Sequence, residues 1–230
     1  MRHEADPGGS RSFGVVPPSR LDRLYARLGT AWQELSEAAL HADSDLVVIG
    51  AGRHGPLRRA IGTTAAKVVN HCDRSVLVVR EWRGPLARFL VALDESEHGV
   101  IVRDYAVELA RRTRVKLRLF RAIGQPARPD TPRQEAAPRD ALRRAAHEAL
   151  HELSRLVPPE LLEDVTAANG ATAWSSICTA AREFDADVSI VGAHAHRLTD
   201  GLLGTTAARV ADHADRSVLV VKHPWRESSA

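Results

Sequence analysis

The heptapeptide Asp73-Arg-Ser-Val-Leu-Val-Val79 recurs unchanged 142 positions later as Asp215-Arg-Ser-Val-Leu-Val-Val221. The same offset places Gly62-Thr-Thr-Ala-Ala66 on Gly204-Thr-Thr-Ala-Ala208. A self-match of this kind is the signature of an internal repeat. The match runs without a gap from Thr30 onward and stops abruptly upstream of Thr30, so we interpret the chain as two copies of unequal length.

Each copy has the pattern of a βαβ unit. A helix with apolar positions at helical spacing is expected first, followed by a short, continuously apolar strand of the kind that is buried on both faces of a parallel sheet. A Gly-containing loop, a helix opening at Gly-Thr-Thr and a second apolar strand follow. The expected helices are 32–42 and 174–184, and the expected strands are 46–49, 76–79, 188–191 and 218–221.

The second copy alone has further elements upstream. We expect strands at 89–93, 115–120 and 165–168, helices at 99–112 and 141–157, and a proline-containing loop at 124–140. These elements complete a β-α-β-α-β-α-β-α-β unit of normal domain size. The predicted organisation is a disordered lead-in at 1–18, a truncated half domain at 19–82 and a complete domain at 85–225.

Composition excludes several classes of protein. The 230 residues carry 32 Lys and Arg against 29 Asp and Glu, a net charge of +3, and no run concentrates positive charge as a nucleic-acid surface would. Two cysteines, Cys72 and Cys178, cannot form a disulfide framework. No stretch approaches the 18 apolar residues of a membrane helix, and the N-terminus lacks the apolar core of a signal peptide. We therefore expect a cytoplasmic protein with neither a nucleic-acid nor a membrane partner.

The ordered motifs of the second copy resemble the universal stress protein family. Phe89-Leu-Val-Ala-Leu-Asp94 is similar to the family's opening strand and its terminal aspartate. Ala186-Asp-Val-Ser-Ile-Val-Gly192 resembles its fourth strand, and His213-Ala-Asp-Arg-Ser-Val-Leu-Val-Val221 resembles its closing turn and strand. The resemblance implies an α/β fold with an open, twisted, five-stranded parallel sheet and helices on both faces, present as one complete copy and one partial copy. It also implies a stress-response regulator without strong catalytic activity.

One subgroup of that family binds ATP through a Gly-x2-Gly-x9-Gly-Ser/Thr pattern. Glycines there let backbone N–H groups approach phosphate oxygens, and a helix N-terminus adds partial positive charge. The resemblance implies that the ATP contacts fall on Gly192, His194, Ala195, Gly204, Thr205 and Thr206, with Asp94 near the ribose and the backbone after Phe120 near the adenine.

This chain departs from the pattern at two points. Ala195 replaces the second glycine, and the loop from Gly192 to Gly204 is one residue shorter. The alternative function is therefore a protein of the same fold that binds a partner and no nucleotide. The first copy keeps Gly50, Gly62 and Thr63 but has Arg53 at the second glycine and lacks the upstream half, so we interpret it as structural.

A third hypothesis rests on the sequence His147-Glu148-Ala149-Leu150-His151. On a helix, H-E-x-x-H can hold zinc between two imidazoles beside a catalytic glutamate, as in metal-dependent hydrolases. The helical pattern places both histidines on the solvent side, opposite the apolar stripe, and no third ligand has suitable spacing. We therefore predict no metal site.

The identical closing strands predict how the two copies meet. Because a shared interface would retain the same sequence on both sides, we expect 76–79 to pair antiparallel with 218–221, as a pseudo-dimer within one chain. The truncation leaves the apolar strand 46–49 without its outer neighbour, and such an edge invites pairing. We expect residues 10–28 to cover it, or the protein to form a homodimer there.

Overall fold

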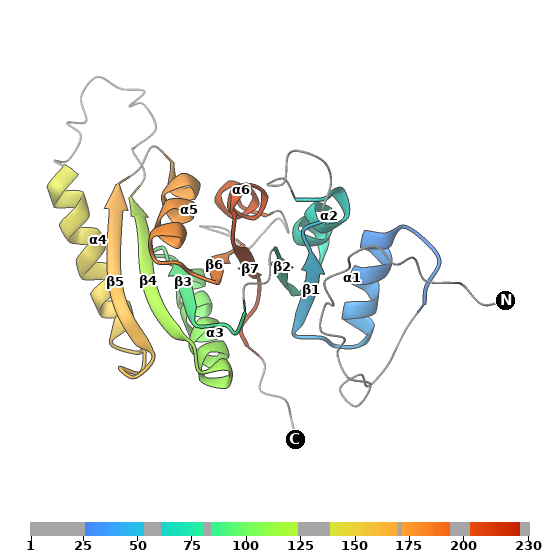
Figure 1. Ribbon diagram of the computed structural model, residues 1–230, viewed down its shortest axis with the longest axis horizontal. Coiled ribbons are helices and arrows are strands. Elements are labelled where there is room, and N and C mark those ends of the chain that lie inside the picture. Colours follow the sequence, from blue (N-terminus) through green and yellow to red (C-terminus); the bar gives the residue numbers. More distant parts are fainter. Residues whose placement is uncertain are drawn as a thin grey trace.

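A computed structural model describes residues 26–52, 61–80, 84–123, 139–169, 172–193 and 203–225. Within these ranges, seven strands form one sheet with six helices around it (Figure 1). The predicted lead-in at 1–18 lies outside the described residues. The first copy contributes α1 (Ala31–His41), β1 (Leu46–Gly50), α2 (Thr63–His71) and β2 (Ser75–Val79). The second contributes β3 (Arg88–Ala92), α3 (Glu97–Thr113), β4 (Lys116–Ile123), α4 (Arg139–Ser154), β5 (Leu162–Asn169), α5 (Ala173–Glu183), β6 (Val188–Gly192), α6 (Thr205–His213) and β7 (Ser217–Val221).

The sheet is larger than the five-stranded sheet expected from the sequence. Its strand order is β1-β2-β7-β6-β3-β4-β5. All pairings among β3 to β7 are parallel, as is the pairing of β1 with β2. The five strands of the second copy form the expected parallel sheet, and the two strands of the first copy extend it to seven.

The antiparallel pairing of the two closing strands is confirmed. β2 pairs with β7 in the register Val76 to Val220, Leu77 to Leu219 and Val78 to Val218. The side chains of this β2–β7 junction are almost entirely buried. A continuous ladder through a buried junction makes the two copies one sheet.

Reciprocal polar contacts also cross the β2–β7 junction. The Ser217 hydroxyl accepts from the amide of Arg80 at 3.1 Å, and its repeat counterpart Ser75 accepts from the amide of Lys222 at 3.2 Å. The Arg80 guanidinium donates to the carbonyl of Ala211 at 2.6 Å, in the last turn of α6, while the Lys222 ammonium donates to the carbonyl of Cys72 at the end of α2. Each cation thus satisfies the negative end of the other copy's helix. Burial lowers the pKa of both cations.

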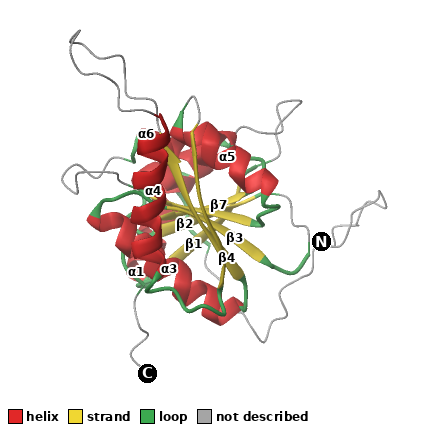
Figure 2. Ribbon diagram, turned by 90° about the vertical axis from the view of Figure 1, so that its left-hand side faces the viewer, coloured by secondary structure: helices red, strands yellow, loops and turns green. Residues whose placement is uncertain are grey.

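Helices cover both faces of the sheet (Figure 2). One apolar core lies under α1, α2, α5 and α6, and contains Val68, Ile177 and Val210 among its buried residues. The second core lies under α3 and α4, around Tyr105 and Leu150. Because the first copy has no counterparts of α3 and α4 among the described residues, this second layer covers chiefly the β3–β7 part of the sheet.

The repeat also preserves local packing around each first helix. The rings of Trp32 and His71 lie 5.0 Å apart, and those of Trp174 and His213 lie 4.7 Å apart. Each tryptophan packs against the first core beside the end of the neighbouring helix. The two tryptophans therefore hold equivalent helix pairs together, α1 with α2 and α5 with α6.

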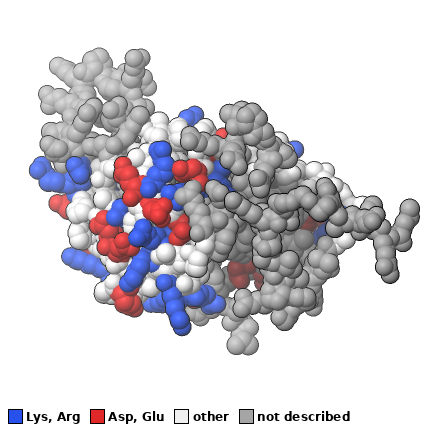
Figure 3. Space-filling view, in the orientation of Figure 1, with Lys and Arg blue, Asp and Glu red and all other residues white. Residues whose placement is uncertain are grey.

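None of the helices in the described ranges is long and apolar enough to cross a membrane. On the face shown in Figure 3, Lys and Arg side chains alternate with Asp and Glu side chains. The described part of that face therefore carries no continuous positive stripe, in agreement with the composition.

Candidate functional site

The topology of the second copy defines one position for a ligand site. From β3 the chain crosses through α3 to β4, which lies toward one edge of the sheet. From β6 it crosses through α6 to β7, which lies toward the other edge. β3 and β6 are neighbours, so the direction of the crossovers reverses between them. In open α/β sheets, ligands bind outside the carboxyl ends of the strands at such a switch point. Of the sequence-predicted residues, Asp94 follows β3, Gly192 ends β6 and Gly204 precedes α6.

Asp94 is half-buried in a tight turn between β3 and α3. Its Oδ1 accepts from the amide of Ser96 at 3.1 Å and from the hydroxyl of Ser96 at 2.5 Å. The Ser96 hydroxyl in turn accepts from the amide of Gly99 at 3.2 Å as the N-cap of α3. A Cβ on Gly99 would lie 2.4 Å from the carbonyl oxygen of Asp94. The aspartate is thus fixed in position by its own turn, with one carboxylate oxygen used by that turn.

Gly192 lies against the first turn of α3. A Cβ added there would meet the Cδ2 of His98 at 2.7 Å and a methyl of Val102 at 3.1 Å. His98 is buried and its Nε2 lies 3.0 Å from the carbonyl oxygen of Val221. The histidine therefore ties α3 to the end of β7 and leaves no room for a side chain at position 192. This packing requirement is independent of any phosphate contact.

The start of α6 is held beside the end of β6. The amide of Gly204, the N-cap residue, donates to the carbonyl of Ala193 at 2.7 Å. Thr205 is exposed, Thr206 is half-buried, and the first turn of α6 carries no acidic side chain. His194 and Ala195 lie outside the described residues, as does the rest of the loop from 194 to 202.

The side of the site toward β4 contains an ion pair that the sequence analysis missed. Arg121 Nη1 lies 2.5 Å from Glu95 Oε1, and this hydrogen bond lowers the pKa of Glu95. The pair joins the end of β3 to the strand β4 just after Phe120, where the resemblance placed an adenine. The carbonyl of Phe120 accepts from the amide of Leu93 at 2.9 Å. No sequence pattern marked Arg121, because its partner becomes adjacent only through the pairing of β3 with β4.

The first copy repeats only the α6 side of the arrangement. Gly62 donates to the carbonyl of Ala51 at 2.7 Å, as Gly204 does to Ala193, and Thr63 opens α2. β1, however, has β2 as its sole strand partner in the described ranges. The described first copy therefore has no switch point, and its purely structural role stays a prediction.

Among the residues that the structure describes, the other candidate groups are either exposed on a helix surface or buried. His147 and His151 are both exposed on α4, as predicted, and their rings meet edge to face with centroids 4.9 Å apart. Within the described ranges, no cluster of three or more His, Cys, Asp or Glu side chains could hold a metal ion. Both cysteines are buried, and burial raises the pKa of the Cys178 thiol to about 11. A buried thiol with such a pKa is a poor nucleophile at neutral pH.

The fold and the switch-point geometry define an α/β protein of the open, doubly wound class. The sequence model of the universal stress protein family matches residues 22–80 and 86–222, and the chain therefore belongs to that family. The two matched segments agree with the two copies seen in the sequence and in the sheet.

Individual relatives match parts of the chain. Universal stress protein G of Shigella flexneri is 32% identical over 82 residues, which are 35% of this chain and 57% of the relative. This chain thus spans little more than half the length of that curated relative. A functionally unknown protein of Pseudomonas aeruginosa PAO1 superposes with a TM-score of 0.62 at 20% identity, over 86% of this chain and 69% of the other. A universal stress protein of Archaeoglobus fulgidus DSM 4304 gives 0.56 at 18% identity, over 85% and 66%. At these identities the structural likeness shows the fold alone.

Proposed function

We propose that this universal stress protein binds ATP in its second copy, at the carboxyl ends of β3, β4 and β6, and acts as a regulator without strong catalytic activity. The observation that carries the proposal is the switch point between β3 and β6, with Asp94 after β3, Gly192 at the end of β6 and the start of α6 hydrogen-bonded to Ala193 just after β6. The resemblance of the motifs to the ATP-binding subgroup supplies the identity of the ligand.

The proposed phosphate contacts come from backbone groups and hydroxyls. The first N–H groups of a helix have no partner within the helix, and together with the helix dipole they attract anions. Gly204 is the N-cap residue of α6 and has no side chain beside the first N–H groups of the helix. Thr205 adds an exposed hydroxyl there. The Asp94 carboxylate would accept from a ribose hydroxyl at the end of β3. His194 and Ala195 belong to the proposed contacts through their place in the 192–204 loop.

The alternative is a partner-binding protein of the same fold that takes no nucleotide. It is favoured by Ala195 in place of a glycine and by the shortened loop, both of which alter the path along which the phosphates would lie. The two candidate functions differ in one testable property: only the first requires adenine nucleotides to bind at the second copy.

Matched variants test this proposal. Asp94→Asn keeps an oxygen for the Ser96 turn but removes the charge, and Thr205→Ala removes the hydroxyl at the start of α6. Thr63→Ala makes the identical change in the first copy. We expect ATP binding to weaken by about ten- to hundredfold for each of the first two changes, because one good hydrogen bond to a charged group contributes about 1.5–3 kcal/mol. Thr63→Ala is expected to bind as the unaltered protein does.

Fluorescence anisotropy of a labelled ATP analogue, displaced by unlabelled ATP, measures all four proteins. Equal affinities for Thr205→Ala and Thr63→Ala would contradict placement of the phosphates at α6. Binding of a partner protein with no displacement by ATP would favour the alternative function.

A further inference from the structure

One face of the two strands of the first copy is apolar and open. Side chains alternate between the faces of a strand, so Val47 and Ile49 pack against the first core whereas Val48 points to the other face. In the described part of the chain no helix covers that face over β1, and Val48 is 61% exposed. We call this surface the open face, and its residues are Leu46, Val48, Gly50, Leu77 and Val79.

The second copy shows what covers the same surface there. The repeat counterparts of the open face are Val188, Ile190, Gly192, Leu219 and Val221. Three of the five positions are identical in the two copies, and the other two exchange one aliphatic side chain for another. α3 packs on β6 and β7, and the four counterparts that have side chains are at most 3% exposed. The open face therefore keeps the surface that accepts a helix in the second copy.

Gly50 is the most specific feature of the open face. Its φ is not positive, so no local backbone strain requires a glycine, and an added Cβ would meet nothing within 4 Å. At its counterpart Gly192, an added Cβ would strike the ring of His98 on α3. A glycine within a strand often marks a place where another group approaches closely. Gly50 thus fits a ring from a helix that is not among the described elements.

The buried stripe of α3 defines the chemistry of such a helix. His98, Val102, Ala106 and Ala110 follow one another at intervals of four positions, and all are buried. This spacing places them on one side of the helix, which is how amphipathic helices bind apolar surfaces. The stripe combines a ring in the first turn with one aliphatic side chain and two alanines, so the helix can lie close to the strands.

The open face is continuous with the interface between the two copies. Leu77 lies opposite Leu219 in the β2–β7 ladder, and both Leu46 and Leu77 pack against the second core. A helix on the open face would therefore extend the core that α3 covers. A sheet face of this kind is stabilised by burial against another element.

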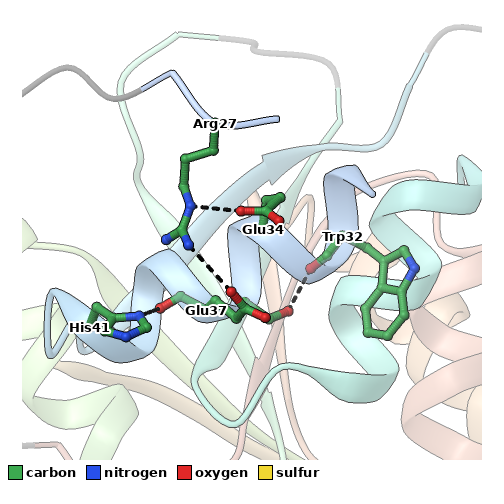
Figure 4. A network of polar contacts seen from close by, with 6 residues as sticks. Arg27, Trp32, Glu34, Glu37 and His41 are labelled. Carbon is green, nitrogen blue, oxygen red and sulfur yellow. Dashed lines mark hydrogen bonds and ion pairs between the residues drawn. The ribbon is translucent and has the colours of Figure 1, made fainter. Parts of the chain in front are cut away.

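The described N-terminal end of the chain lies on the other face of the sheet. Arg27 is held on α1 by ion pairs to Glu34 at 2.7 Å and Glu37 at 3.3 Å (Figure 4), and α1 packs against the first core. The sequence predicts that residues 10–28 cover the edge of β1; of these, 10–25 lie outside the described ranges, and Leu28 is 99% exposed. Each of the six described helices already packs on its own sheet or on a neighbouring helix, so a second copy of the described chain offers no free helix. These observations favour a helix from another protein.

We propose that the open face binds an amphipathic helix of a partner protein, which presents a ring beside Gly50 and aliphatic and small side chains over Val48 and Leu77. The first copy then has a binding role of its own, separate from the ATP site proposed in the second copy.

A peptide with the sequence of α3, residues 97–113, is the probe because it carries the required pattern. Isolated helices of this length are marginal in water, so a lactam bridge joins positions 108 and 112, where Glu108 and Arg112 form an i,i+4 ion pair. Arg112→Lys in the peptide supplies the amine for the bridge. Fluorescence anisotropy of the labelled peptide measures its binding to the full chain, and light scattering gives the molar mass of the chain alone.

We expect saturable binding to the unaltered chain, which is a monomer without the peptide. Val48→Asp should weaken binding by roughly tenfold or more, because the bound helix would bury an unpaired carboxylate. Gly50→Val, which fills the place of the ring, should weaken it by about tenfold through overpacking. Leu156→Asp adds the same charge at an exposed position after α4, which packs on β4 and β5 at the opposite end of the sheet, and should bind as the unaltered chain does.

Two results would overturn the proposal. Equal affinities of the peptide for Val48→Asp and Leu156→Asp would place the helix elsewhere on the molecule. Absence of saturable binding to the unaltered chain would mean that the open face does not accept a helix, and a doubled molar mass that Val48→Asp abolishes would assign the face to a second copy of the chain. The assay contains no nucleotide, so its failure is distinct from a failure of the proposed ATP site.

Discussion

Leu219→Asp is expected to abolish stable folding. Leu219 is fully buried at the centre of the β2–β7 junction, opposite Leu77 and beside Ile190. Loss of a buried leucine costs about 2–5 kcal/mol, and an unpaired buried carboxylate adds several more. Their sum approaches the whole stability of an ordinary domain, about 5–15 kcal/mol. Urea unfolding followed by far-ultraviolet circular dichroism measures the loss.

The control for this change is Leu156→Asp. Leu156 is 68% exposed, so the same substitution there should change the free energy of unfolding by no more than about 0.5 kcal/mol. If Leu219→Asp retained a midpoint close to that of Leu156→Asp, the junction of the two copies would not be a buried part of the fold.

Gly192→Val is expected to destabilise the protein by about 1–3 kcal/mol, the usual cost of overpacking a filled interior. The added side chain would strike His98, whose ring is fixed between α3 and the carbonyl of Val221. Gly50→Val makes the same change at the repeat counterpart, where a Cβ meets nothing within 4 Å. It should alter stability by no more than about 0.5 kcal/mol.

Thermal unfolding of the two valine variants gives this comparison directly. Equal melting temperatures would mean that α3 does not constrain position 192. A lower melting temperature for Gly192→Val alone would show that this glycine is required by packing, whether or not a phosphate lies nearby.

The repeat made the larger features of the fold predictable. Identity of Ser75–Val79 with Ser217–Val221 indicated a shared interface, and the ladder of β2 with β7 confirms it. The sequence could not show how the two serines and the two cations exchange contacts across the junction. Those contacts depend on the register and on the positions of both helix ends, which arise only in the assembled sheet.

The candidate site was predictable in part. The family resemblance marked Asp94, Gly192 and Gly204, and the topology brings the ends of their strands and the start of their helix to one edge. The pattern could not reveal His98, since its role comes from contact between α3 and the distant β6 and β7. For the same reason it could not separate the packing requirement at Gly192 from a ligand requirement.

Isothermal titration of the unaltered protein with ATP tests the central claim most directly, because it counts the sites. The two copies share the Gly-Thr-Thr helix start, but the switch point occurs in the second copy alone among the described residues. The predicted result is saturable heat with one ATP per chain, retained in Thr63→Ala and weakened in Thr205→Ala. Absence of both heat and thermal stabilisation at millimolar ATP would contradict the proposed function, and two sites per chain would contradict the structural role assigned to the first copy.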